Sequence, residues 1–204
     1  MLHALLDRLV NFLLIRTFAT TGRVRAAIQG LRFAKFGSCC SLGRRVRILG
    51  GRFCEFGDFV SVASNTRIEC FSAHNLDTFK PTFRVGSGTS INFDCHIACI
   101  NSIVIGRDVL IASRVFISDH SHGDPSNQEH SAMPPSCRPL HSKSGIEIGD
   151  CAWIGEGVSI LPGSKIGDNC IIGANSVVSG VIPSNSIAVG APARVIRKLN
   201  EKRQ

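Results

Sequence analysis

Aromatic residues are scarce in this chain of 204 residues: they make up 6% of it, with one tryptophan and no tyrosine. Large rings usually dominate the thick core of a globular domain, so their scarcity argues against a wide core. It favours a narrow core that is filled by Ile, Val, Leu and smaller side chains. The length supports one domain, with room for a small appendage.

Long apolar runs and paired cysteine motifs are also missing. The run Leu9–Ile15 is interrupted by Asn11 and is much shorter than the ~20 residues that span a bilayer. No basic segment precedes this run, which argues against a secretory signal peptide. Nine cysteines occur without a Cys-x-x-Cys pair, so neither a zinc ribbon nor a disulfide framework is expected. We interpret them as small buried apolar residues of a cytoplasmic protein in a reducing compartment.

Acidic residues are nearly absent from residues 1–52, which hold one acid, Asp7, against ten basic residues. The basic residues are Arg8, Arg16, Arg23, Arg25, Arg32, Lys35, Arg44, Arg45, Arg47 and Arg52. This segment carries +9 while the whole chain carries +8, so the remainder is close to neutral. Such a bias is generic for nucleic-acid binding, but no aromatic interleaving or reader motif accompanies it, so we expect no nucleic-acid partner. An anionic membrane surface or a pyrophosphate-linked substrate suits the pattern better.

The stretch Ile146–Ser179 carries an aliphatic residue at every sixth position. These residues are Ile148, Ile154, Ile160, Ile166, Ile172 and Val178. The spacing fits neither an amphipathic helix, with a period of about 3.6, nor a simple strand, with a period of about 2. It predicts a solenoid of about eighteen residues per coil, with one aliphatic residue pointing inward from each of three flat faces. We therefore predict an all-β fold, a single-stranded left-handed parallel β-helix, although most parallel crossovers are right-handed.

Two other positions of the repeat fit the same coil. A smaller residue stands four places after each aliphatic residue, where two faces converge and space is short. These residues are Ala152, Val158, Ser164, Cys170 and Ser176. Glycine directly follows four of the aliphatic residues, and we expect it to relax the backbone limits at each bend.

Before the coil, residues 1–40 are expected to form a basic helical segment, because apolar residues recur at helical spacing from Leu2 to Leu13. Such a helix can cap the open end of the solenoid. It can also attach the protein to the inner face of a membrane, and both roles can hold together.

The β-helix is expected over residues 41–182. Residues 70–84 break the repeat as a loop or a bulged coil. Residues 119–145 contain no hexad, four prolines and four histidines, and an insert of this length in a compact coil is usually functional. We expect this loop to project outward from a corner. Residues 183–204 should leave the coil and end in a short basic helix.

The loop and the single tryptophan are the first candidates for chemistry. His120 begins the loop directly after the strand sequence VFISD, and histidine is well suited to take a proton from a hydroxyl at physiological pH. A loop histidine that merely bonds a backbone carbonyl is the plainer alternative. Trp153 follows the corner position Ala152, so its side chain should point out of the coil, where it could form the floor of a binding groove.

Four segments in a fixed order resemble the hexapeptide-repeat O-acetyltransferases. They are Ile117-Ser-Asp-His-Ser-His-Gly123, Arg138-Pro-Leu140, Ala152-Trp-Ile-Gly155 and Gly190-Ala-Pro-Ala-Arg194. The resemblance covers about residues 85–198 and is close to the galactoside and maltose acetyltransferases and to enzymes that acetylate bacterial surface polysaccharides. It implies a homotrimer, acetyl-CoA as acetyl donor, a saccharide hydroxyl as acceptor and no metal. It also implies direct transfer with His120 as general base, whereas a loop-stabilising role on the acceptor side suits its rival His122.

The resemblance further assigns candidate residues by register. Those for acetyl-CoA are Trp153, Glu156, Ala174, Ser179, Gly180, Arg194 and Arg197, with the two arginines placed at the CoA phosphates. On the acceptor side Asn92 matches an Asn-Phe-Asn-Cys-like segment that contacts sugar in the sugar acetyltransferases, and Asp94 departs from that pattern.

Other functions remain open on the sequence. One is an N-acyltransferase that acts on an amino sugar or a xenobiotic with the same fold and donor. Another is a metal-dependent hydratase of the γ-carbonic-anhydrase kind, which needs three histidines around zinc. His96, His120 and His122 are the candidates for it, but their spacing does not resemble that family. A purely structural coil is the last alternative.

Overall fold

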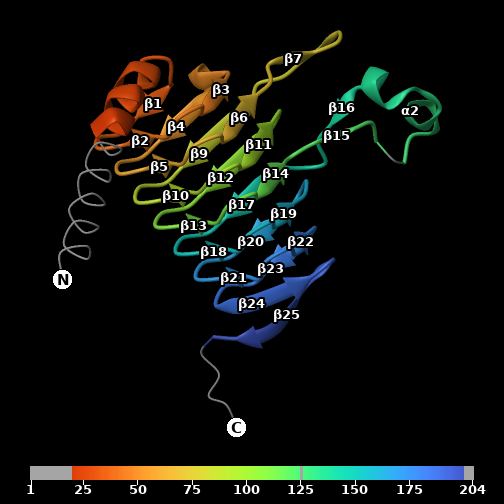
Figure 1. Cartoon of the computed structure of the whole chain (residues 1–204). Helices are drawn as coiled ribbons and strands as arrows, with labels where there is room; N and C mark the ends of the chain where they lie inside the picture. Colours follow the sequence, from red (N-terminus) through yellow and green to blue (C-terminus); the bar gives the residue numbers. More distant parts are fainter. Residues whose placement is uncertain (1–19, 125, 200–204) are drawn as a thin grey trace, which may run out of the picture.

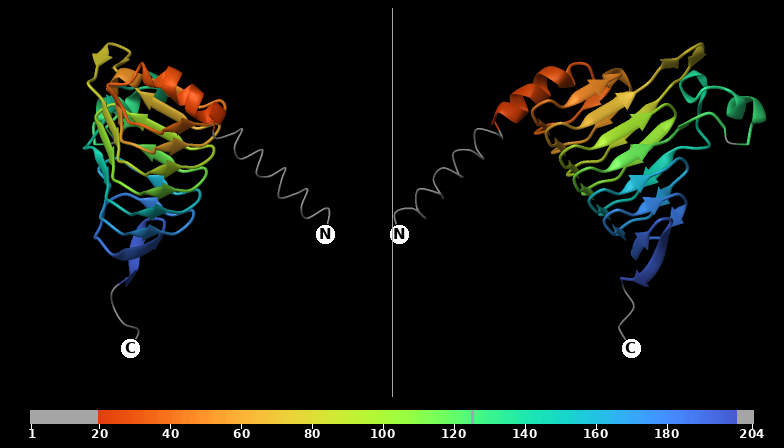
Figure 2. Two further views of the ribbon diagram at one scale, coloured as in Figure 1. Left: turned by 90° about the vertical axis from the view of Figure 1, so that its left-hand side faces the viewer. Right: turned by 45° about the vertical axis from the view of Figure 1, so that its right-hand side comes forward.

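The computed structural model describes residues 20–124 and 126–199. Short parallel strands wind into one coil with three flat faces, so the chain is a left-handed parallel β-helix (Figure 1). A helix over residues 20–30 covers the first coil, and two projections leave the coil on one side (Figure 2).

Each face of the coil is one sheet. The first face consists of β1 (Lys35–Phe36), β4 (Cys54–Phe56), β9 (Thr82–Val85), β12 (Ser102–Ile105), β17 (Ile146–Ile148), β20 (Lys165–Ile166) and β23 (Val181–Ile182). The second face consists of β2 (Ser41–Leu42), β5 (Ser61–Val62), β10 (Ser90–Ile91), β13 (Leu110–Ile111), β18 (Trp153–Ile154), β21 (Ile171–Ile172), β24 (Ser186–Gly190) and β25 (Ala193–Lys198). The third face consists of β3 (Arg47–Leu49), β6 (Arg67–Cys70), β11 (His96–Cys99), β14 (Phe116–Ser118), β19 (Ser159–Ile160) and β22 (Val177–Val178).

The six-residue ladder fills the interior as predicted. All six of its aliphatic residues are buried, with exposed fractions of 3% or less. Each stacks on an aliphatic residue of a neighbouring coil, as Ile148 does on Ile166, Ile154 on Ile172 and Val178 on Ile160. Because the side chains fill the prism from all three faces, no central channel remains, and function has to be sought on the outer faces and edges.

The smaller residues also occupy the corners as predicted. Ala152, Val158, Ser164, Cys170 and Ser176 are all buried. The polar ones are hydrogen-bonded: the Ser164 hydroxyl donates to the backbone oxygen of Val178 at 2.9 Å, and the Cys170 thiol donates to that of Pro183 at 3.2 Å. A polar atom in this narrow core is therefore tolerated because a backbone acceptor lies beside it.

The explanation for the glycines was wrong. The glycines that follow the inward aliphatic residues do not have positive φ angles; that conformation falls two positions later, for example at Asp108 (φ 55°) and Asn169 (φ 54°). What excludes a side chain at Gly106 is the next coil, because a Cβ there would lie 2.7 Å from the backbone nitrogen of Asp150. Close stacking of coils selects these glycines, and residues that tolerate the left-handed region make the bend.

The N-terminal end of the coil differs from the prediction in two ways. The helix ends at residue 30, and the first strand of the coil, β1, already pairs with β4. Contrary to the expectation of a core without aromatic rings, Phe56 and Phe83 pack inside the coil at this end. Their exposed fractions are 1% and 0%, and their ring centroids lie 6.0 Å apart. On the helix, Ala26 joins the core, which confirms the expected capping role of the described part.

Both projections leave the coil at the edge between the third and first faces. Between β6 and β9, the strands β7 (Ala73–His74) and β8 (Asp77–Thr78) form an antiparallel hairpin where the repeat is broken. Between β14 and β17, the predicted loop contains β15 (Ser121–His122), β16 (Leu140–His141), the helix α2 (Gln128–Ala132) and a 3-10 turn (Pro135–Cys137). A second 3-10 turn (Gly51–Phe53) lies at the same edge nearer the cap. Figures 1 and 2 show the hairpin and the loop extending in the same direction.

The predicted C-terminal helix was wrong for the described part of the tail. The chain turns back after Gly190, and β25 pairs antiparallel with β24 at the end of the second face. The β-branched residues Val195 and Ile196 favour a strand, and the open edge of β24 offers it backbone partners. The last coil is thus capped by a strand.

Three of the nine cysteines, Cys39, Cys137 and Cys151, are exposed, so the expectation of burial holds for the other six only.

Among residues 20–124 and 126–199, no helix is both long and apolar enough to span a bilayer. The predicted membrane contact of the first apolar residues falls outside the described part of the chain.

Candidate active site

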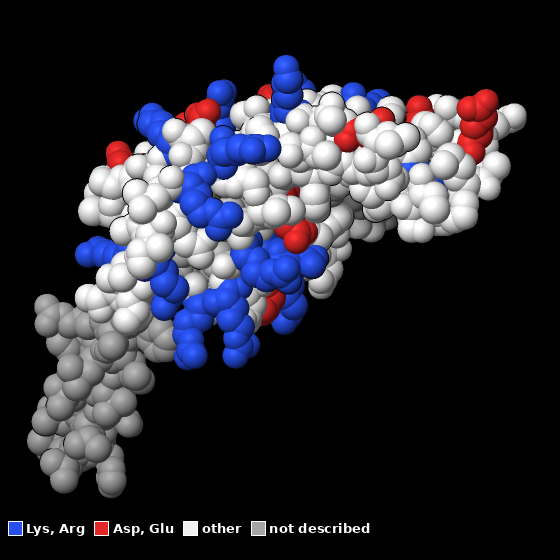
Figure 3. Space-filling model, turned by 90° about the horizontal axis from the view of Figure 1, so that it is seen from above, with Lys and Arg blue, Asp and Glu red and all other residues white. Residues whose placement is uncertain are grey.

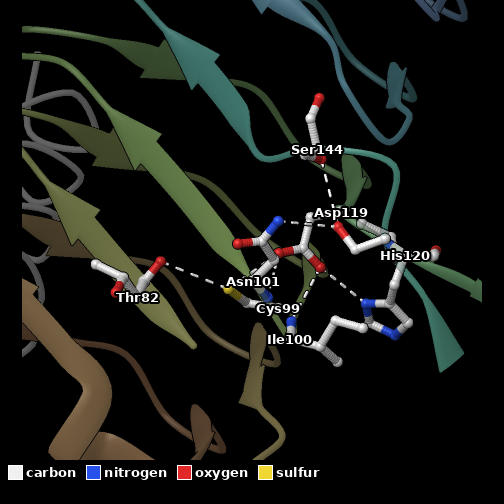
Figure 4. Close-up of polar contacts among 9 residues, drawn as sticks. Thr82, Cys99, Ile100, Asn101, Asp119, His120 and Ser144 are labelled. Carbon is white, nitrogen blue, oxygen red and sulfur yellow. Dashed lines mark hydrogen bonds and ion pairs between the residues drawn. The ribbon is translucent and has the colours of Figure 1, made fainter. Parts of the chain in front are cut away.

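The strand β14 ends at Ser118 and delivers two adjacent residues, Asp119 and His120, to the edge between the third and first faces. Asp119 is fully buried. Its carboxylate accepts hydrogen bonds from the backbone nitrogens of Ile100 at 2.9 Å and Asn101 at 2.8 Å. These two residues form the corner of the neighbouring coil, so the stacking of coils fixes the position of the carboxylate (Figure 4).

The same carboxylate orients the imidazole of His120. Asp119 Oδ1 lies 2.9 Å from His120 Nδ1, and the histidine side chain is 9% exposed. A carboxylate is an acceptor, so Nδ1 carries the proton and Nε2 presents its lone pair. The Ser118 hydroxyl donates to the backbone oxygen of His120 at 2.9 Å and braces the turn. Sequence analysis singled out His120 but missed Asp119. The signal that could have identified it is its position directly before His120 at the end of the strand.

The pKa of Asp119 supports this assignment. Burial alone would raise that pKa, but hydrogen bonds from His120 and from the backbone of Ile100 and Asn101 outweigh burial and hold the pKa below its ordinary value. The group is therefore ionised at neutral pH. It can orient a neutral imidazole and stabilise the imidazolium that forms when the ring takes a proton.

A thiol also lies near the carboxylate. Cys99 Sγ is 3.3 Å from Asp119 Oδ2 and is buried. Its pKa is raised by hydrogen bonding with the Cys70 thiol, by burial and by the negative charge of Asp119. It stays protonated and donates a hydrogen bond, so it is no nucleophile.

The hairpin between β6 and β9 packs against the histidine loop. The ring of Phe71 lies edge-on to His120, with centroids 6.1 Å apart, and His74 lies edge-on to His122 at 5.7 Å. The Nε2 atom of His74 is buried and has no hydrogen-bond partner. Sequence analysis recognised these residues as a break in the repeat and gave them no role.

Some of the candidate cofactor residues fall on one outward column of the second face. Strand pairing places Leu110, Trp153, Ile171 and Ile187 in register, and Arg197 pairs with Ile187. Trp153 is 51% exposed, which confirms that it points out of the coil. With strands ~4.8 Å apart, the column runs roughly 14 Å from Trp153 to Arg197. It is an apolar strip with a cation at its end.

Other candidates follow the edge between the second and third faces. Glu156 and Ala174 stand one coil apart in the turns after β18 and β21, and Asn92 follows β10 at the same edge. Glu156 forms an ion pair with Arg114. The predicted acceptor residue thus shares an edge with predicted donor residues and is separated from His120 by the width of the third face.

The remaining candidates lie elsewhere. Ser179 and Gly180 stand exposed after β22, at the edge that also carries His120, and no atom lies within 4 Å of a Cβ built on Gly180. Arg194 is exposed on β25, and its guanidinium donates to the backbone oxygen of Ala193 at 3.0 Å. His122 is exposed on β15. The roles of all these residues stay predictions.

The three histidines considered for a zinc site have different partners. His96 Nε2 lies 2.9 Å from Glu69 and its Nδ1 lies 3.0 Å from Arg67, whereas His120 faces Asp119 and His122 faces His74. In the described part of the chain, no group of three or more His, Cys, Asp or Glu residues is arranged to hold a metal ion. The residues present do not fit the site that a hydratase of this kind needs.

A three-sided coil with a histidine-bearing loop at one edge is the arrangement that the resemblance to the hexapeptide-repeat transferases predicted. Residues 145–180 match the family described as "Bacterial transferase hexapeptide (six repeats)". The crystal structure of a maltose O-acetyltransferase from Clostridium difficile 630 is 30% identical, with a TM-score of 0.58, and the match covers 87% of this chain and 75% of that one. The chain therefore belongs to the hexapeptide-repeat acetyltransferase family, as its sequence predicted.

Two other relatives extend the comparison. Over 133 residues the chain is 48% identical to WbbJ of Escherichia coli (strain K12), described as a "Putative lipopolysaccharide biosynthesis O-acetyl transferase"; the alignment covers 62% of this chain and 66% of WbbJ. The hexapeptide-repeat acetyltransferase VCA0836 of Vibrio cholerae, solved in complex with acetyl-CoA, is 22% identical with a TM-score of 0.61, covering 91% of this chain and 87% of that one; this likeness concerns the fold. The chain spans less than two thirds of the length of the first curated relatives that it matches.

Proposed function

We propose that this protein transfers an acetyl group from acetyl-CoA to a hydroxyl group of a saccharide, in the biosynthesis of a bacterial surface polysaccharide. The observation that carries the proposal is the Asp119–His120 pair, in which a buried carboxylate bonds Nδ1 and leaves Nε2 available. The family of the chain supports acyl transfer, and the similarity to WbbJ supports a polysaccharide acceptor.

The chemistry needs one base and no covalent intermediate on the protein. Nε2 of His120 removes the proton from the acceptor hydroxyl while the oxygen attacks the thioester carbonyl. The tetrahedral intermediate collapses, the carbon–sulfur bond breaks, and the proton passes from the imidazolium to the departing CoA sulfur. Asp119 stabilises the imidazolium between these two steps. Because the thioester is already activated, positioning the two substrates supplies much of the rate, up to ~7–11 kcal/mol in ideal cases.

The distribution of candidate residues favours a site built from two copies of the chain. The column with Trp153 and Arg197 lies on the second face, and in a three-sided prism this face is opposite the edge that carries His120. A single chain therefore cannot bring both to one acetyl group. A homotrimer, in which the histidine loop of one subunit reaches the second face of the next, removes this difficulty.

Along that face the pantetheine arm would pack on the apolar strip that includes Trp153, and the phosphates would reach Arg194 and Arg197. Arginine suits phosphate because its planar donors bind two oxygens at once. We place the protein in the cytoplasm, where acetyl-CoA is made, with its basic end toward the inner face of the membrane.

Replacing Arg194 and Arg197 together by Ala should raise the KM for acetyl-CoA by about tenfold and leave kcat nearly unchanged, because the phosphates of CoA take no part in the reaction. The KM for 3′-dephospho-acetyl-CoA should rise less. Steady-state kinetics with both donors measure the difference. An equal rise for the two donors would show that these arginines do not hold the 3′-phosphate.

The function itself is tested by incubating the protein with acetyl-CoA and a panel of saccharide acceptors and following thiol release. We expect release that depends on a saccharide and a product whose added acetyl group is lost in mild alkali, as an ester is. An alkali-stable amide on an amino sugar would identify an N-acyltransferase instead. If thiol release did not depend on a hydroxyl or an amino acceptor, both the O-acetyltransferase and the N-acyltransferase functions would be contradicted.

A further inference from the structure

The hairpin between β6 and β9 shelters a hollow beside the catalytic histidine. The hollow has a volume of about 440 Å³, and its walls include Arg32, Arg52, Phe53, Phe71 and Ser72. We propose that it binds a phosphate or pyrophosphate group of the acceptor, so that the substrate is a phosphorylated saccharide. This inference rests on the proposed acetyl transfer and names the class of acceptor.

The charge of the hollow is positive and not compensated. None of the residues that line it is acidic. Arg52 lies 4.8 Å from the ring centroid of Phe53 and donates to the Ser72 hydroxyl at 3.4 Å, and neither Arg52 nor Arg32 forms one of the ion pairs seen among the described residues. The Arg52 guanidinium lies at the hollow without a carboxylate partner, and Arg32 is part of the same wall. An anion can therefore bind there at no loss of an existing ion pair.

The hollow and the candidate base share one wall. Phe71 lines the hollow, and its ring contacts His120 edge-on with centroids 6.1 Å apart. A substrate that is anchored by a charged group on one side of this ring can therefore present a hydroxyl on the other side. An acceptor with a phosphate close to the acetylated sugar suits this arrangement, whereas a neutral polymer would leave the two arginines without an anionic partner.

Two glycines in the wall of the hollow pack closely against neighbouring backbone. Gly50 has a φ of 70°, a conformation that side chains other than glycine rarely adopt. Gly51 is buried, and a Cβ there would lie 3.0 Å from the backbone oxygen of Arg32. Glycine backbone in a turn therefore forms this part of the wall, and turn backbone is common at anion sites.

The surrounding surface favours the same class of ligand. Figure 3 shows lysine and arginine side chains gathered over the end of the coil that carries the helix, while acidic side chains are few there. The described residues 20–52 belong to this end, and they hold eight basic residues and no acidic one. The field of such a cluster raises the local concentration of anionic substrates.

The direct test is binding of inorganic pyrophosphate to the full chain, measured by calorimetry with CoA present at saturation so that the CoA phosphate site is filled. We expect one site per chain. Arg32→Gln and Arg52→Gln should each weaken it by about tenfold or more, as loss of a charge-assisted bond does. Arg23→Gln removes the same charge from an exposed position on the capping helix and should change the affinity less than twofold. No binding by the wild-type protein, or equal binding by the Arg32→Gln/Arg52→Gln double variant, would overturn the proposal.

A kinetic arm identifies the source of the phosphate. Acetyl transfer is compared for a sugar 1-phosphate, a nucleoside diphosphate sugar, a diphosphate-linked lipid saccharide in detergent, and the matched neutral saccharides. The double variant should raise the KM for the preferred phosphorylated acceptor at least tenfold and leave the KM for neutral acceptors unchanged. If every acceptor is inert while pyrophosphate binding depends on the two arginines, the acetyltransferase proposal fails and the anion site stands. Preference of the wild type for neutral acceptors would overturn the role of the hollow.

Discussion

His120→Ala should lower kcat by about 10²–10⁴-fold, the usual contribution of a positioned general base. The ring is held by Asp119 at one nitrogen, and no other imidazole contacts this carboxylate among its hydrogen bonds. Affinity for CoA should stay within about twofold, because His120 is not among the residues predicted to bind CoA and its ring acts on the acceptor hydroxyl. Single-turnover acetyl transfer and calorimetry with CoA measure the two quantities separately.

His122→Ala is the matched control for this experiment. It removes the same side chain two positions away from an exposed site, where its only described ring contact is with His74. We expect a change of a few-fold, mainly in the KM for the acceptor. A large loss of kcat in His122→Ala with near-normal turnover in His120→Ala would transfer the role of base to His122.

The repeat made the interior of this molecule predictable. A period of six residues leaves one side chain per face to point inward, so Ile148, Ile154 and their successors could be placed in the core before any coordinates. The same logic located the loop, since a coil accepts insertions only at its corners. It also placed Trp153 on the outer surface.

The misses share a physical cause: each depends on contacts between coils or between segments distant in sequence. The role of Asp119 depends on Ile100 and Asn101, which stacking alone brings to its carboxylate. The conformation of the tail depends on the free edge of β24. A repeat period predicts which residues face inward, but it does not show which outer positions meet across an edge.

The candidate site divides in the same way. The family motif predicted His120, and register predicted the donor residues, yet only the coordinates show that the column with Trp153 and Arg197 lies on the face opposite His120. The hairpin with Phe71 and His74 carried no motif at all. Its signal in the sequence was the interruption of the repeat after β6, which marks a segment retained for something other than the coil.

Asp119→Asn should lower kcat by about 10²–10⁴-fold without changing the affinity for CoA, because a neutral amide cannot stabilise the imidazolium as a carboxylate does. The shape of the kcat/KM profile against pH should also change, because the variant loses the negative charge that lies beside the reacting groups. A defect of folding alone would lower the amount of active protein and leave the shape of that profile unchanged. The profile therefore separates a positioning role from a purely structural one.

The same substitution should reduce the free energy of unfolding by about 1–3 kcal/mol. The NH₂ group of the amide cannot accept a hydrogen bond, so it cannot pair with both backbone N–H groups of Ile100 and Asn101 as the carboxylate does. The sign of the pH dependence follows from the pKa of Asp119, which is lowered in the folded state. Its stabilisation is present above the unfolded pKa of about 3.9 and is lost as the pH falls through the lower folded pKa. The gap between wild type and variant should thus be widest at neutral pH and narrow below about pH 4.

Asp108→Asn provides the control for this comparison. Asp108 is exposed and sits at a corner with φ 55°, a conformation that asparagine adopts readily, so the change of charge is the same without burial. Denaturant unfolding between pH 3 and pH 7 should show little difference for it. If Asp119→Asn kept wild-type stability and an unshifted profile, the carboxylate would be a bystander, and the alignment of His120 would have to come from the turn at Ser118 alone.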